Sequence, residues 1–507
     1  MKTGKVYLIG AGPGDPGLIT VKGATCLKQA GVVVYDYLVN PQLLREAAGE
    51  AERVYVGKKG GAHSRSQKEI NALIVGKARE GKIVARLKGG DPFIFGRGGE
   101  EAEALAEAGI PFEVVPGVTS AIAVPAYAGI PLTHRGFTST VAFITGHEDP
   151  TKGAAKASWD KMAAAAGTLV FLMGRENLPL ITSVLLQNGR DPTTPVALIR
   201  WGTLTEQETL VGELSSIAEM ARAKQMKPPL IIVVGEVVEL REKLNWFETL
   251  PLFGKKILVT RAREQASGLS ERLRELGAIP IEFPTIEIRP PESWIDVDHC
   301  ASRIQEYDWI IFTSPNGVRF FLERIIAIGR DIRDLKGPQV CAIGPKTKEA
   351  LESLKIKVDW VPPEYRAEAI FEGLRRGNLK GKKILIPRAD VARDILPLEL
   401  KKAGAEVNVV EVYRTVSPQN DREEILELLR SRAISVITFT SSSTVSNFVE
   451  MIGKSEAREL TSGTVVACIG PVTAEKARSL GIETSLVPQE YTIPALVQTL
   501  VEHFAGK

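Results

Sequence analysis

The stretch KVYLIGAGPGD, residues 5–15, joins an apolar, β-branched run to a glycine-rich loop, as expected of a strand that ends in a tight turn. Similar runs follow in the first half of the chain: VVVYDYLV (32–39), KIVARLKGG (82–90), VAFITGH (141–147), TLVFLMG (168–174), PVALIRWG (195–202) and LIIVVGEVVEL (230–240). Helix-like segments separate them. Apolar strands that alternate with helices predict α/β layers with sheets covered on both faces.

This pattern pauses at REKLNWFETLPLFG (241–254), where Pro251 and Gly254 indicate a linker. A second unit starts at residue 255 and repeats itself. KKILVTRAREQASGLSERLRELGAIPIEFPTIEI (255–288) resembles GKKILIPRADVARDILPLELKKAGAEVNVVEVYRTV (381–416). WIIFTSPNGVRFFLE (309–323) and VCAIGPKTKEALESLKI (340–356) resemble VITFTSSSTVSNFVE (436–450) and VACIGPVTAEKARSLGI (466–482). We expect two copies of one α/β arrangement that face each other across a cleft.

Each copy places small residues where a helix is expected to begin, in the "TS" and "IGP" elements. The backbone N–H groups of a helix start are available to anions. The same serines and threonines are also ordinary helix caps. Both interpretations stand at this point.

Composition and charge exclude several classes of protein. The 507 residues suggest three to four domains as a prior, and 44% apolar with 25% charged residues is typical of a soluble globular protein. A net charge of +3 does not point to nucleic acid or to a membrane surface as a partner. It permits a local basic cleft for an acidic small molecule.

The cysteines and the apolar runs indicate the cellular compartment of the protein. Four cysteines lie far apart without a C-x-x-C pair, which argues against a disulfide framework or a metal site: Cys26, Cys300, Cys341 and Cys468. The N-terminal apolar stretch is too short for a signal peptide. An uncharged run at 114–133 is long enough to span a bilayer, but prolines and glycines divide it. We expect a cytoplasmic protein without a membrane span.

The first glycine loop does not fit a dinucleotide. Asp15 stands where G-x-G-x-x-G requires glycine, and Pro13 has no N–H to give to a pyrophosphate. A loop that repels anions suits a cationic or zwitterionic ligand, unless it is only a structural turn.

Seven motifs in order carry a resemblance: GAGPGDPGLITVKG (10–23), YDYLV (35–39), VGKKGGAHSRSQKEIN (56–71), RLKGGDPFIFGRGGEE (86–101), VVPGVTSAIAVPAYAGIPLTHR (114–135), TLVFLMG (168–174) and PPLIIVVGEVV (228–238). Over residues 4–245 the chain resembles the tetrapyrrole methylases, and most closely the uroporphyrinogen-III C-methyltransferases. Residues 252–505 resemble uroporphyrinogen-III synthases through ILVTRAR (257–263), FTSPNGV (312–318), AIGP (342–345), ILIPRA (384–389), VYRT (412–415), FTSSS (439–443) and IGP (469–471).

The resemblance implies a domain plan. Residues 1–246 would form a tetrapyrrole methylase fold of two α/β subdomains, 1–133 and 134–246, followed by a linker at 247–254. Residues 255–507 would form two flavodoxin-like or Rossmann-like α/β/α lobes. Lobe A would hold 255–285 and 415–507, and lobe B 286–414. A homodimer through the methylase half is also implied.

The methylase resemblance implies transfer of two methyl groups from S-adenosylmethionine to uroporphyrinogen III, giving precorrin-2. The implied cofactor contacts are Pro13, Gly89, Gly90, Asp91, Ile94, Thr119, Ser120, Met173 and Gly202. Asp91 would pair with the ligand's ammonium group. Asp36 matches the family's proton acceptor and Lys58 its proton donor, although a cap and a solvated charge are the ordinary roles of such residues. Basic residues in the same motifs could face substrate carboxylates: Arg86, Lys88, Arg97, His134 and Arg135.

The synthase resemblance implies closure of hydroxymethylbilane to uroporphyrinogen III with inversion of the last ring. Tyr413 matches the best candidate for the acid that protonates the leaving hydroxyl, or it packs at a strand end. The candidates for binding the carboxylates of the substrate are Ser314, Asn316, Gly317, Gly344, Ser441, Ser442, Ser443, Gly470 and Thr473. Arg261 and Arg388 occupy equivalent repeat positions and either bind the substrate or pin loops.

Other functions remain as alternatives. The first half could be a methylase for a later corrinoid, for rRNA or for diphthine, and the second half a two-lobed binding module without catalysis. A fused synthase argues against the other methylases, because it would supply this methylase's own substrate. The binding module predicts binding of the linear bilane without turnover. A fused NAD-linked dehydrogenase is disfavoured, since the chain has no further glycine fingerprint. The sequence leaves open whether the product feeds sirohaem, cobalamin or haem d1.

Overall fold

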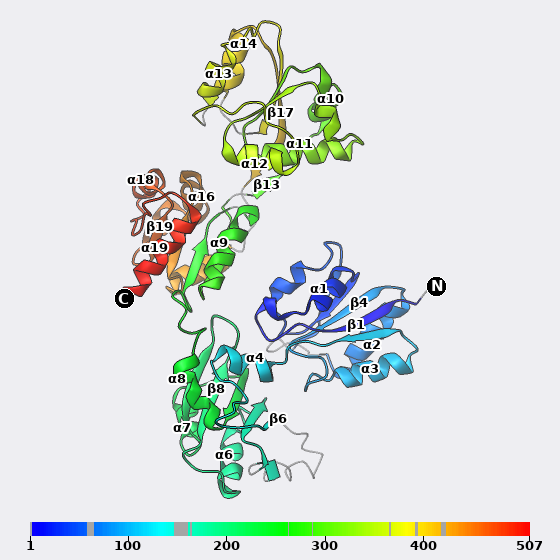
Figure 1. Cartoon of the computed structure of the whole chain (residues 1–507), viewed down its shortest axis with the longest axis vertical. Coiled ribbons are helices and arrows are strands. Elements are labelled where there is room, and N and C mark those ends of the chain that lie inside the picture. Colours follow the sequence, from blue (N-terminus) through cyan, green and yellow to red (C-terminus); the bar gives the residue numbers. More distant parts are fainter. Residues whose placement is uncertain are drawn as a thin grey trace. The chain divides into compact units, whose positions relative to one another are not determined.

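The computed structural model describes residues 3–57, 65–146, 161–162, 165–261, 263–285, 287–364, 367–390, 394–416 and 422–506. The chain forms two compact units. Met1–Lys255 and Glu275–Ile279 make up the first unit, and Lys256–Arg274 and Pro280–Lys507 the second. Both are built from sheets and helices, which confirms the α/β fold class (Figure 1).

The first sheet of unit 1 is parallel and has the order β3-β2-β4-β1-β5. Its strands are β1 (Lys5–Gly10), β2 (Val32–Tyr35), β3 (Glu52–Tyr55), β4 (Ile83–Lys88) and β5 (Phe112–Val115), with helices α1 (Val21–Lys28), α2 (Gln67–Arg79), α3 (Gly98–Glu107) and α4 (Ser120–Tyr127). Alternate residues of the strands enter different cores. Ile9 packs with Leu27 of α1, whereas Leu8 packs with Ile74 of α2 and Leu105 of α3. Helices therefore cover both faces (Figure 1).

The second sheet of unit 1 is mixed and has the order β6-β7-β10-β8-β9. It contains β6 (Val141–Thr145), β7 (Thr168–Leu172), β8 (Pro195–Arg200), β9 (Glu208–Glu213) and β10 (Leu230–Val234), accompanied by α6 (Leu178–Gln187), α7 (Ile217–Ala223) and α8 (Arg241–Leu244). β10 runs antiparallel to β7 and β8. All five residues of β10 are buried, as expected for a central strand with both faces covered.

Unit 2 has two sheets. One has the order β12-β11-β18-β19 and the other β13-β17-β16-β14-β15. The strands are β11 (Lys256–Val259), β12 (Ile279–Glu282), β13 (Glu287–Arg289), β14 (Trp309–Phe312), β15 (Gln339–Ala342), β16 (Lys383–Ala389), β17 (Glu406–Val416), β18 (Val436–Phe439) and β19 (Val465–Cys468). The repeat seen in the sequence appears as equal strand order, because β11, β18 and β19 correspond to β16, β14 and β15.

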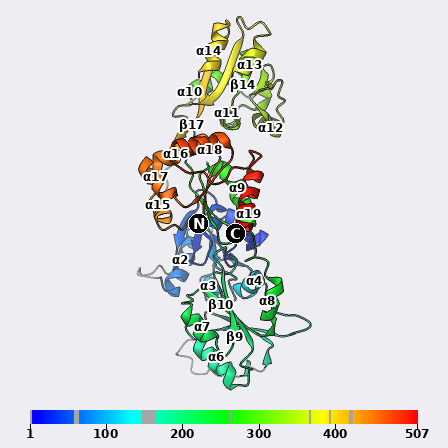
Figure 2. The same cartoon turned by 90° about the vertical axis from the view of Figure 1, so that its left-hand side faces the viewer.

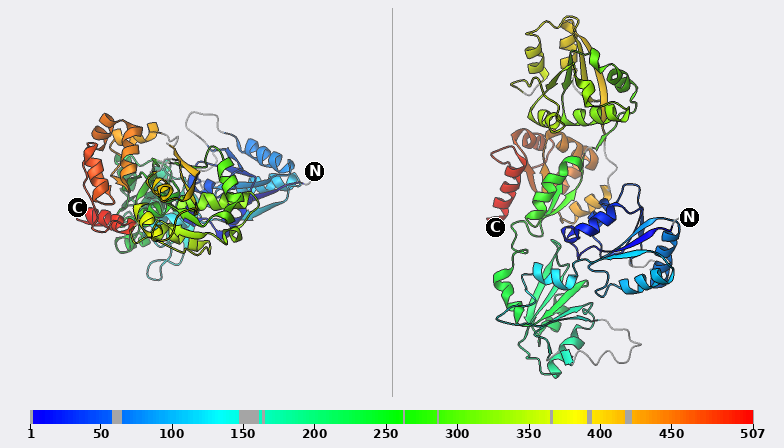
Figure 3. Two further views of the ribbon diagram at one scale, coloured as in Figure 1. Left: turned by 90° about the horizontal axis from the view of Figure 1, so that it is seen from above. Right: turned by 45° about the vertical axis from the view of Figure 1, so that its right-hand side comes forward.

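The helices of unit 2 follow the same repeat. They are α9 (Arg263–Glu275), α10 (Ile295–Ser302), α11 (Pro315–Ala327), α12 (Pro345–Ser353), α13 (Ala367–Leu374), α14 (Ile395–Lys402), α15 (Arg422–Arg430), α16 (Ser442–Ile452), α17 (Lys454–Thr461), α18 (Pro471–Ser479) and α19 (Ile493–Ala505). α11 contacts α12 as α16 contacts α18 (Figure 2). The last helix, α19, red in Figure 3, packs against β19.

The uncharged run at 114–133 forms the end of β5 and helix α4. Pro125 lies inside α4, and the helix is eight residues long. Within the described ranges, every helix is too short or too polar to cross a bilayer.

Candidate active site

A cavity of about 800 Å³ lies in unit 1, where loops of both its sheets meet. The walls come from the carboxyl ends of β1, β2, β4, β7 and β8, from α4, and from the segment that enters β10. The carboxyl edge is where α/β enzymes place their ligands. Asp36, Lys88, Arg175 and Glu176 bring charge to a wall that is otherwise mostly apolar.

Glycines let the loops of the first sheet approach one another. A Cβ atom on Gly10 would lie 2.5 Å from the Cα of Gly117 and 2.7 Å from the carbonyl oxygen of Gly90. Gly12 and Gly90 exchange backbone hydrogen bonds of 3.2 and 2.9 Å. On the facing side, a Cβ on Gly202 would lie 2.3 Å from the side chain of Val124. The glycine-rich motifs are thus required by close backbone contact.

Strained residues gather in the same loops. Five residues other than glycine have a positive φ here: Phe95 (52°), Arg97 (59°), Met173 (57°), Trp201 (48°) and Thr203 (72°). Such conformations cost about 1–3 kcal/mol each and cluster at ligand sites. Their concentration supports this cavity as a functional site.

Most of the residues expected to contact S-adenosylmethionine lie at this cavity. Seven of the nine line its wall: Pro13, Gly89, Gly90, Ile94, Ser120, Met173 and Gly202. Asp91 and Thr119 are not part of the wall. Thr119 is the N-cap of α4 and accepts a hydrogen bond from the N–H of Ala121.

The carboxylate of Asp91 is occupied by the backbone. Oδ1 accepts hydrogen bonds from the N–H groups of Phe93 (2.8 Å) and Ile94 (3.1 Å), and Oδ2 accepts one from Gly117 (2.9 Å). Asp91 therefore ties the loop after β4 to the loop after β5. A contact between Asp91 and an ammonium group remains a prediction, and the arrangement adds an anchoring role.

Asp15 also anchors a loop. Its carboxylate accepts hydrogen bonds from the N–H of Gly17 (2.7 Å) and from the hydroxyl of Tyr127 (2.6 Å). Burial, together with this bond, raises the pKa of Tyr127 well above its usual value. The Asp15 N–H donates to Thr203 Oγ1 at 3.0 Å, which joins the first glycine loop to the loop after β8.

Asp36 follows β2 and lines the cavity. Oδ1 accepts a hydrogen bond from the N–H of Leu38 at 3.2 Å, and Oδ2 lies 3.4 Å from Nη2 of Arg86. The side chain is 27% exposed, so it can meet a ligand. Lys58, its predicted partner in proton transfer, lies outside the described residues.

A buried ionic cluster lies behind this wall. Glu101 of α3 is fully buried, and its Oε1 lies 3.1 Å from Nε of Arg86 and 3.0 Å from Nζ of Lys88. Gln67 donates to the same oxygen at 3.2 Å. Burial and the positive charge of Arg86 lower the pKa of Lys88. Arg86 was one of the five basic residues that could face substrate carboxylates; its side chain is buried between Glu101 and Asp36.

Glu101 is not among the residues that the sequence motifs predict for the site. A signal was present, because two cations inside the buried strand β4 require a buried anion close by. The other basic residues of these motifs are exposed. Arg97 pairs with Glu100 through two contacts of 2.8 Å, and Nδ1 of His134 accepts a hydrogen bond from the N–H of Gly136. His134 and Arg135 are not part of the cavity wall.

In unit 2, the predicted anion-binding residues lie at four helix starts. Ser314 is the N-cap of α11 and Gly344 that of α12; Ser441 and Gly470 cap α16 and α18. Each helix follows a strand that runs parallel to its neighbour, so two helix starts lie at neighbouring strand ends in each copy. Asn316, Gly317, Ser442, Ser443 and Thr473 belong to the first turns of these helices.

The four caps differ in their side chains. Oγ of Ser314 accepts from the N–H of Gly317 at 3.0 Å, and Ser441 forms a capping box with Thr444. The described residues provide no side-chain cap at Gly344 and Gly470. The backbone N–H groups of those two first turns are therefore the better placed to meet an anion.

Tyr413 lies near the end of β17, and its hydroxyl is 3.0 Å from Oγ of Ser314. The side chain is 9% exposed, and its ring stacks on Phe320 with centroids 5.9 Å apart. Packing and hydrogen bonding are thus both present. The hydroxyl reaches the start of α11, where the predicted anion site lies.

The two arginines of the repeat occupy comparable places. Arg261 follows β11, and Arg388 lies near the end of β16, the corresponding strand. Arg388 forms an ion pair with Asp394 at the start of α14, which supports a loop-pinning role. Burial lowers the pKa of Arg261.

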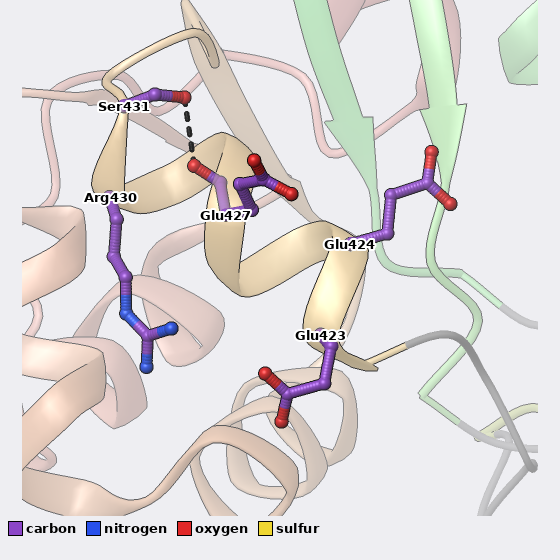
Figure 4. Close-up of a pocket in the computed structure, with 5 residues that line it drawn as sticks. All are labelled: Glu423, Glu424, Glu427, Arg430 and Ser431. Atoms are coloured by element: carbon purple, nitrogen blue, oxygen red, sulfur yellow. Dashed lines mark hydrogen bonds between the residues drawn. The ribbon is translucent and has the colours of Figure 1, made fainter. Parts of the chain in front are cut away.

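A hollow on α15 contains none of these residues. Its lining consists of Glu423, Glu424, Glu427, Arg430 and Ser431, all drawn in Figure 4. The dashed line marks the hydrogen bond from the Ser431 hydroxyl to the carbonyl oxygen of Glu427, at 2.8 Å. This is an acidic helix surface. Among the described residues, no group of three or more His, Cys, Asp or Glu side chains could hold a metal ion.

Comparison with known proteins finds a family match for each half of the chain. The family Tetrapyrrole (Corrin/Porphyrin) Methylases matches residues 5–218, and the family Uroporphyrinogen-III synthase HemD matches residues 267–498. The porphyrin biosynthesis protein HemD of Ruminiclostridium josui is 39% identical over 506 residues, which cover 100% of this chain and 99% of that protein.

Two further relatives match the first half. The S-adenosyl-L-methionine-dependent uroporphyrinogen III methyltransferase of Methanosarcina barkeri is 53% identical over 242 residues, 48% of this chain and 95% of that protein. A crystal structure of uroporphyrin-III C-methyl transferase from Thermus thermophilus is 42% identical and covers 47% of this chain and 100% of that chain, with a TM-score of 0.40. The full-length match and the two family matches together show that this chain belongs to the porphyrin biosynthesis proteins that join a tetrapyrrole methylase to a uroporphyrinogen-III synthase.

Proposed function

We propose that the chain is a bifunctional enzyme that closes hydroxymethylbilane to uroporphyrinogen III and methylates this product twice to give precorrin-2. The observation that carries the proposal is the pairing of the two families on one chain, matched over its whole length by a porphyrin biosynthesis protein. The product of the second unit would be the substrate of the first.

S-adenosylmethionine is the proposed methyl donor, as in the Methanosarcina relative. The residues present fit it: the cavity of about 800 Å³ has glycines at its wall, and a Cβ on Gly89 would lie 2.6 Å from Leu38. Gly89, Gly90, Ile94 and Met173 would hold the donor. It supplies a methyl group from a sulfonium, so each transfer brings one positive charge to the macrocycle, and one proton must leave.

The residues at the cavity wall have separate tasks in this reaction. Asp36, which is 27% exposed, accepts the proton that leaves. Lys58, outside the described residues, is the proton donor that the resemblance implies. Asp91 and Asp15 hold their loops, and with them the glycines that approach the ligand. The apolar part of the wall excludes water from the reacting carbons.

In the second unit, Tyr413 donates a proton to the leaving hydroxyl of hydroxymethylbilane, which departs as water. Ser314, at 3.0 Å, holds the tyrosine hydroxyl at the start of α11. The helix starts at Gly344, Ser441 and Gly470 bind carboxylates of the substrate through backbone N–H groups. Arg261 adds a positive charge.

Two assays on the intact chain test the two activities separately. With uroporphyrinogen III and S-adenosylmethionine, we expect a product heavier by two methyl groups. With hydroxymethylbilane alone, we expect the type III isomer in place of the type I isomer that forms spontaneously. Methylation without type III product would support the binding-module alternative for the second unit, and type III product without methylation a different methylase substrate.

We also propose a cytoplasmic homodimer joined through the methylase half. All four cysteines are buried and free, which suits a reducing compartment. Apolar side chains such as Phe93 (53% exposed) and Ile122 (50%) offer surface for a second copy. Light scattering on the intact chain should give twice the mass of 55.0 kDa.

A further inference from the structure

Lys88 is a lysine whose surroundings differ from those of a surface charge. It is the last residue of β4, it lines the cavity, and its side chain is 5% exposed. Its contact with Glu101 is a single distance of 3.0 Å to Oε1. Lysine changes its pKa readily when it is buried, and for that reason serves as a base in enzymes.

The charges around Lys88 come from three elements. Arg86 lies on the same strand, Glu101 on α3 and Asp36 in the loop after β2. Arg86 takes one contact from Glu101 and another from Asp36, at 3.1 and 3.4 Å. Glu101 and Asp36 carry two negative charges, and Arg86 carries one positive charge. A proton on Lys88 would therefore make the net charge of the cluster zero.

Glu101 is asymmetric. Its Oε1 serves Arg86, Lys88 and Gln67, whereas Oε2 is buried without a hydrogen-bond partner among the described residues. A carboxylate oxygen that is unused in the resting state can strengthen its interaction when the neighbouring lysine gains a proton. Glu101 is therefore a counter-ion already in place for a lysine that changes its charge.

We propose that Lys88 is a proton acceptor in the methyl transfer: in its unprotonated form, the amine at the cavity wall takes a proton released by the methylated macrocycle. This rests on the proposed function of the first unit. In each transfer the S–C bond of the sulfonium breaks with its electron pair left on sulfur, and a C–C bond forms at a ring carbon. The macrocycle becomes a cation, loses one proton to the nitrogen of Lys88, and returns to its former charge. Two transfers release two protons, so Lys88 acts beside Asp36 and does not replace it.

The lowered pKa of Lys88 agrees with this role. A base must be unprotonated, so kcat should fall as the pH falls through the pKa of Lys88, at a midpoint below the ordinary lysine value of 10.5. A lysine that only binds a substrate carboxylate must instead be charged. Removal of such a substrate-binding lysine would raise KM, and Lys88→Arg would keep the positive charge and therefore the activity.

The test uses the intact chain with uroporphyrinogen III and saturating S-adenosylmethionine, and compares Lys88→Arg, Lys88→Ala and a surface control, Lys77→Arg. Lys77 pairs with Glu52 outside the cavity wall. We expect kcat of Lys88→Arg to be about 100-fold or more lower than that of the wild type, with little change in KM. The fall of kcat toward low pH, which is the acid limb of the pH profile, should also disappear in this variant. Methylamine should restore part of the kcat of Lys88→Ala, and Lys77→Arg should match the wild type.

Calorimetry of S-adenosylmethionine binding to each variant reports whether the cavity is intact. A Lys88→Arg enzyme with wild-type kcat and an unchanged acid limb would overturn the proposal, as would a Lys88→Ala enzyme that gains nothing from methylamine and differs only in KM. If the wild-type chain does not methylate uroporphyrinogen III at all, the proposed function fails before Lys88 is tested, so the two failures are distinguishable.

Discussion

The proposed methylase site is built mainly from side chains, whereas the proposed synthase site is built mainly from backbone N–H groups. In unit 1, charged side chains are held by other side chains, as Arg86 and Lys88 are held by Glu101 behind one cavity. In unit 2, the duplicated site elements are helix starts, two of which have glycine caps. The first site needs particular side chains, whereas the second needs backbone N–H groups at particular places.

This difference explains why the two halves are unequally recognisable in the sequence. A side-chain site leaves a motif such as RLKGGDPFIFGRGGEE at 86–101, in which most residues have a defined contact. A backbone site requires only that the chain turn into a helix, which Ser314, Gly344, Ser441 and Gly470 all allow. The second half is therefore recognised by the order of weak elements and by its internal repeat.

The largest expected effect concerns the one side chain with a proposed catalytic role in unit 2. Tyr413→Phe keeps the ring on Phe320 and removes the hydroxyl next to Ser314. We expect the synthase rate to fall by ~100- to 10,000-fold, the usual range for general acid catalysis, with methylation unchanged. The readout is the isomer ratio from hydroxymethylbilane, which should shift to type I. Pure type III product at the wild-type rate would return Tyr413 to a packing role.

The second-largest expected effect concerns the stability that unit 1 owes to its buried charges. Glu101→Gln leaves Arg86 and Lys88 without their shared anion, and removing one partner of a buried ion pair costs about 3–5 kcal/mol. Hydrogen exchange of peptides from β4 and α3 should report this loss. The matched control is Glu100→Gln in the exposed pair with Arg97, which should cost less than about 1 kcal/mol. Equal effects of the two variants would contradict the buried-cluster account.

A smaller effect separates two roles of Asp91. Asp91→Asn replaces one acceptor oxygen by a donor, so a backbone N–H of Phe93, Ile94 or Gly117 loses its partner. We expect a loss of stability of about 1–3 kcal/mol, again by hydrogen exchange. Wild-type stability combined with weaker binding of S-adenosylmethionine would show instead that Asp91 contacts the ligand's ammonium group.

The smallest effect compares two caps of unit 2. Ser441→Ala removes a capping box and should cost about 1 kcal/mol in the stability of α16. Ser314→Ala removes a cap of similar value at α11 and, in addition, the partner of the Tyr413 hydroxyl. We therefore expect similar stability losses, measured by hydrogen exchange, but a larger loss of synthase rate for Ser314→Ala. Equal rates would show that the contact with Tyr413 is only structural.

The strands of unit 1 were predictable where their residues form a long apolar run, as they do even in the edge strand β6. All seven apolar runs are strands, whereas β3, β5 and β9 were missed. Those three are edge strands, and residues such as Glu52, Arg53 and Glu208 interrupt any apolar run in them. An edge strand exposes part of its surface to water, so its sequence carries a weaker signal.

The sequence predicted which glycines meet at one cavity, and it predicted the contacts of the charged residues less well. Seven of nine expected cofactor contacts line one cavity, because the motif residues follow strand ends that share an edge. Asp91 and Asp15 proved to be bound to backbone N–H groups and a tyrosine, which depends on loops distant in sequence. The same limit applies to Glu101, whose contact with Lys88 exists only after α3 has packed on β4.

The most direct test of the account supplies the intact chain with hydroxymethylbilane as its only tetrapyrrole and with methyl-labelled S-adenosylmethionine. Two working sites on one chain predict a single major product of the type III series that carries two labelled methyl groups. Unlabelled type III product, or type I porphyrinogen alone, would contradict the claim that the two units of this chain perform successive reactions.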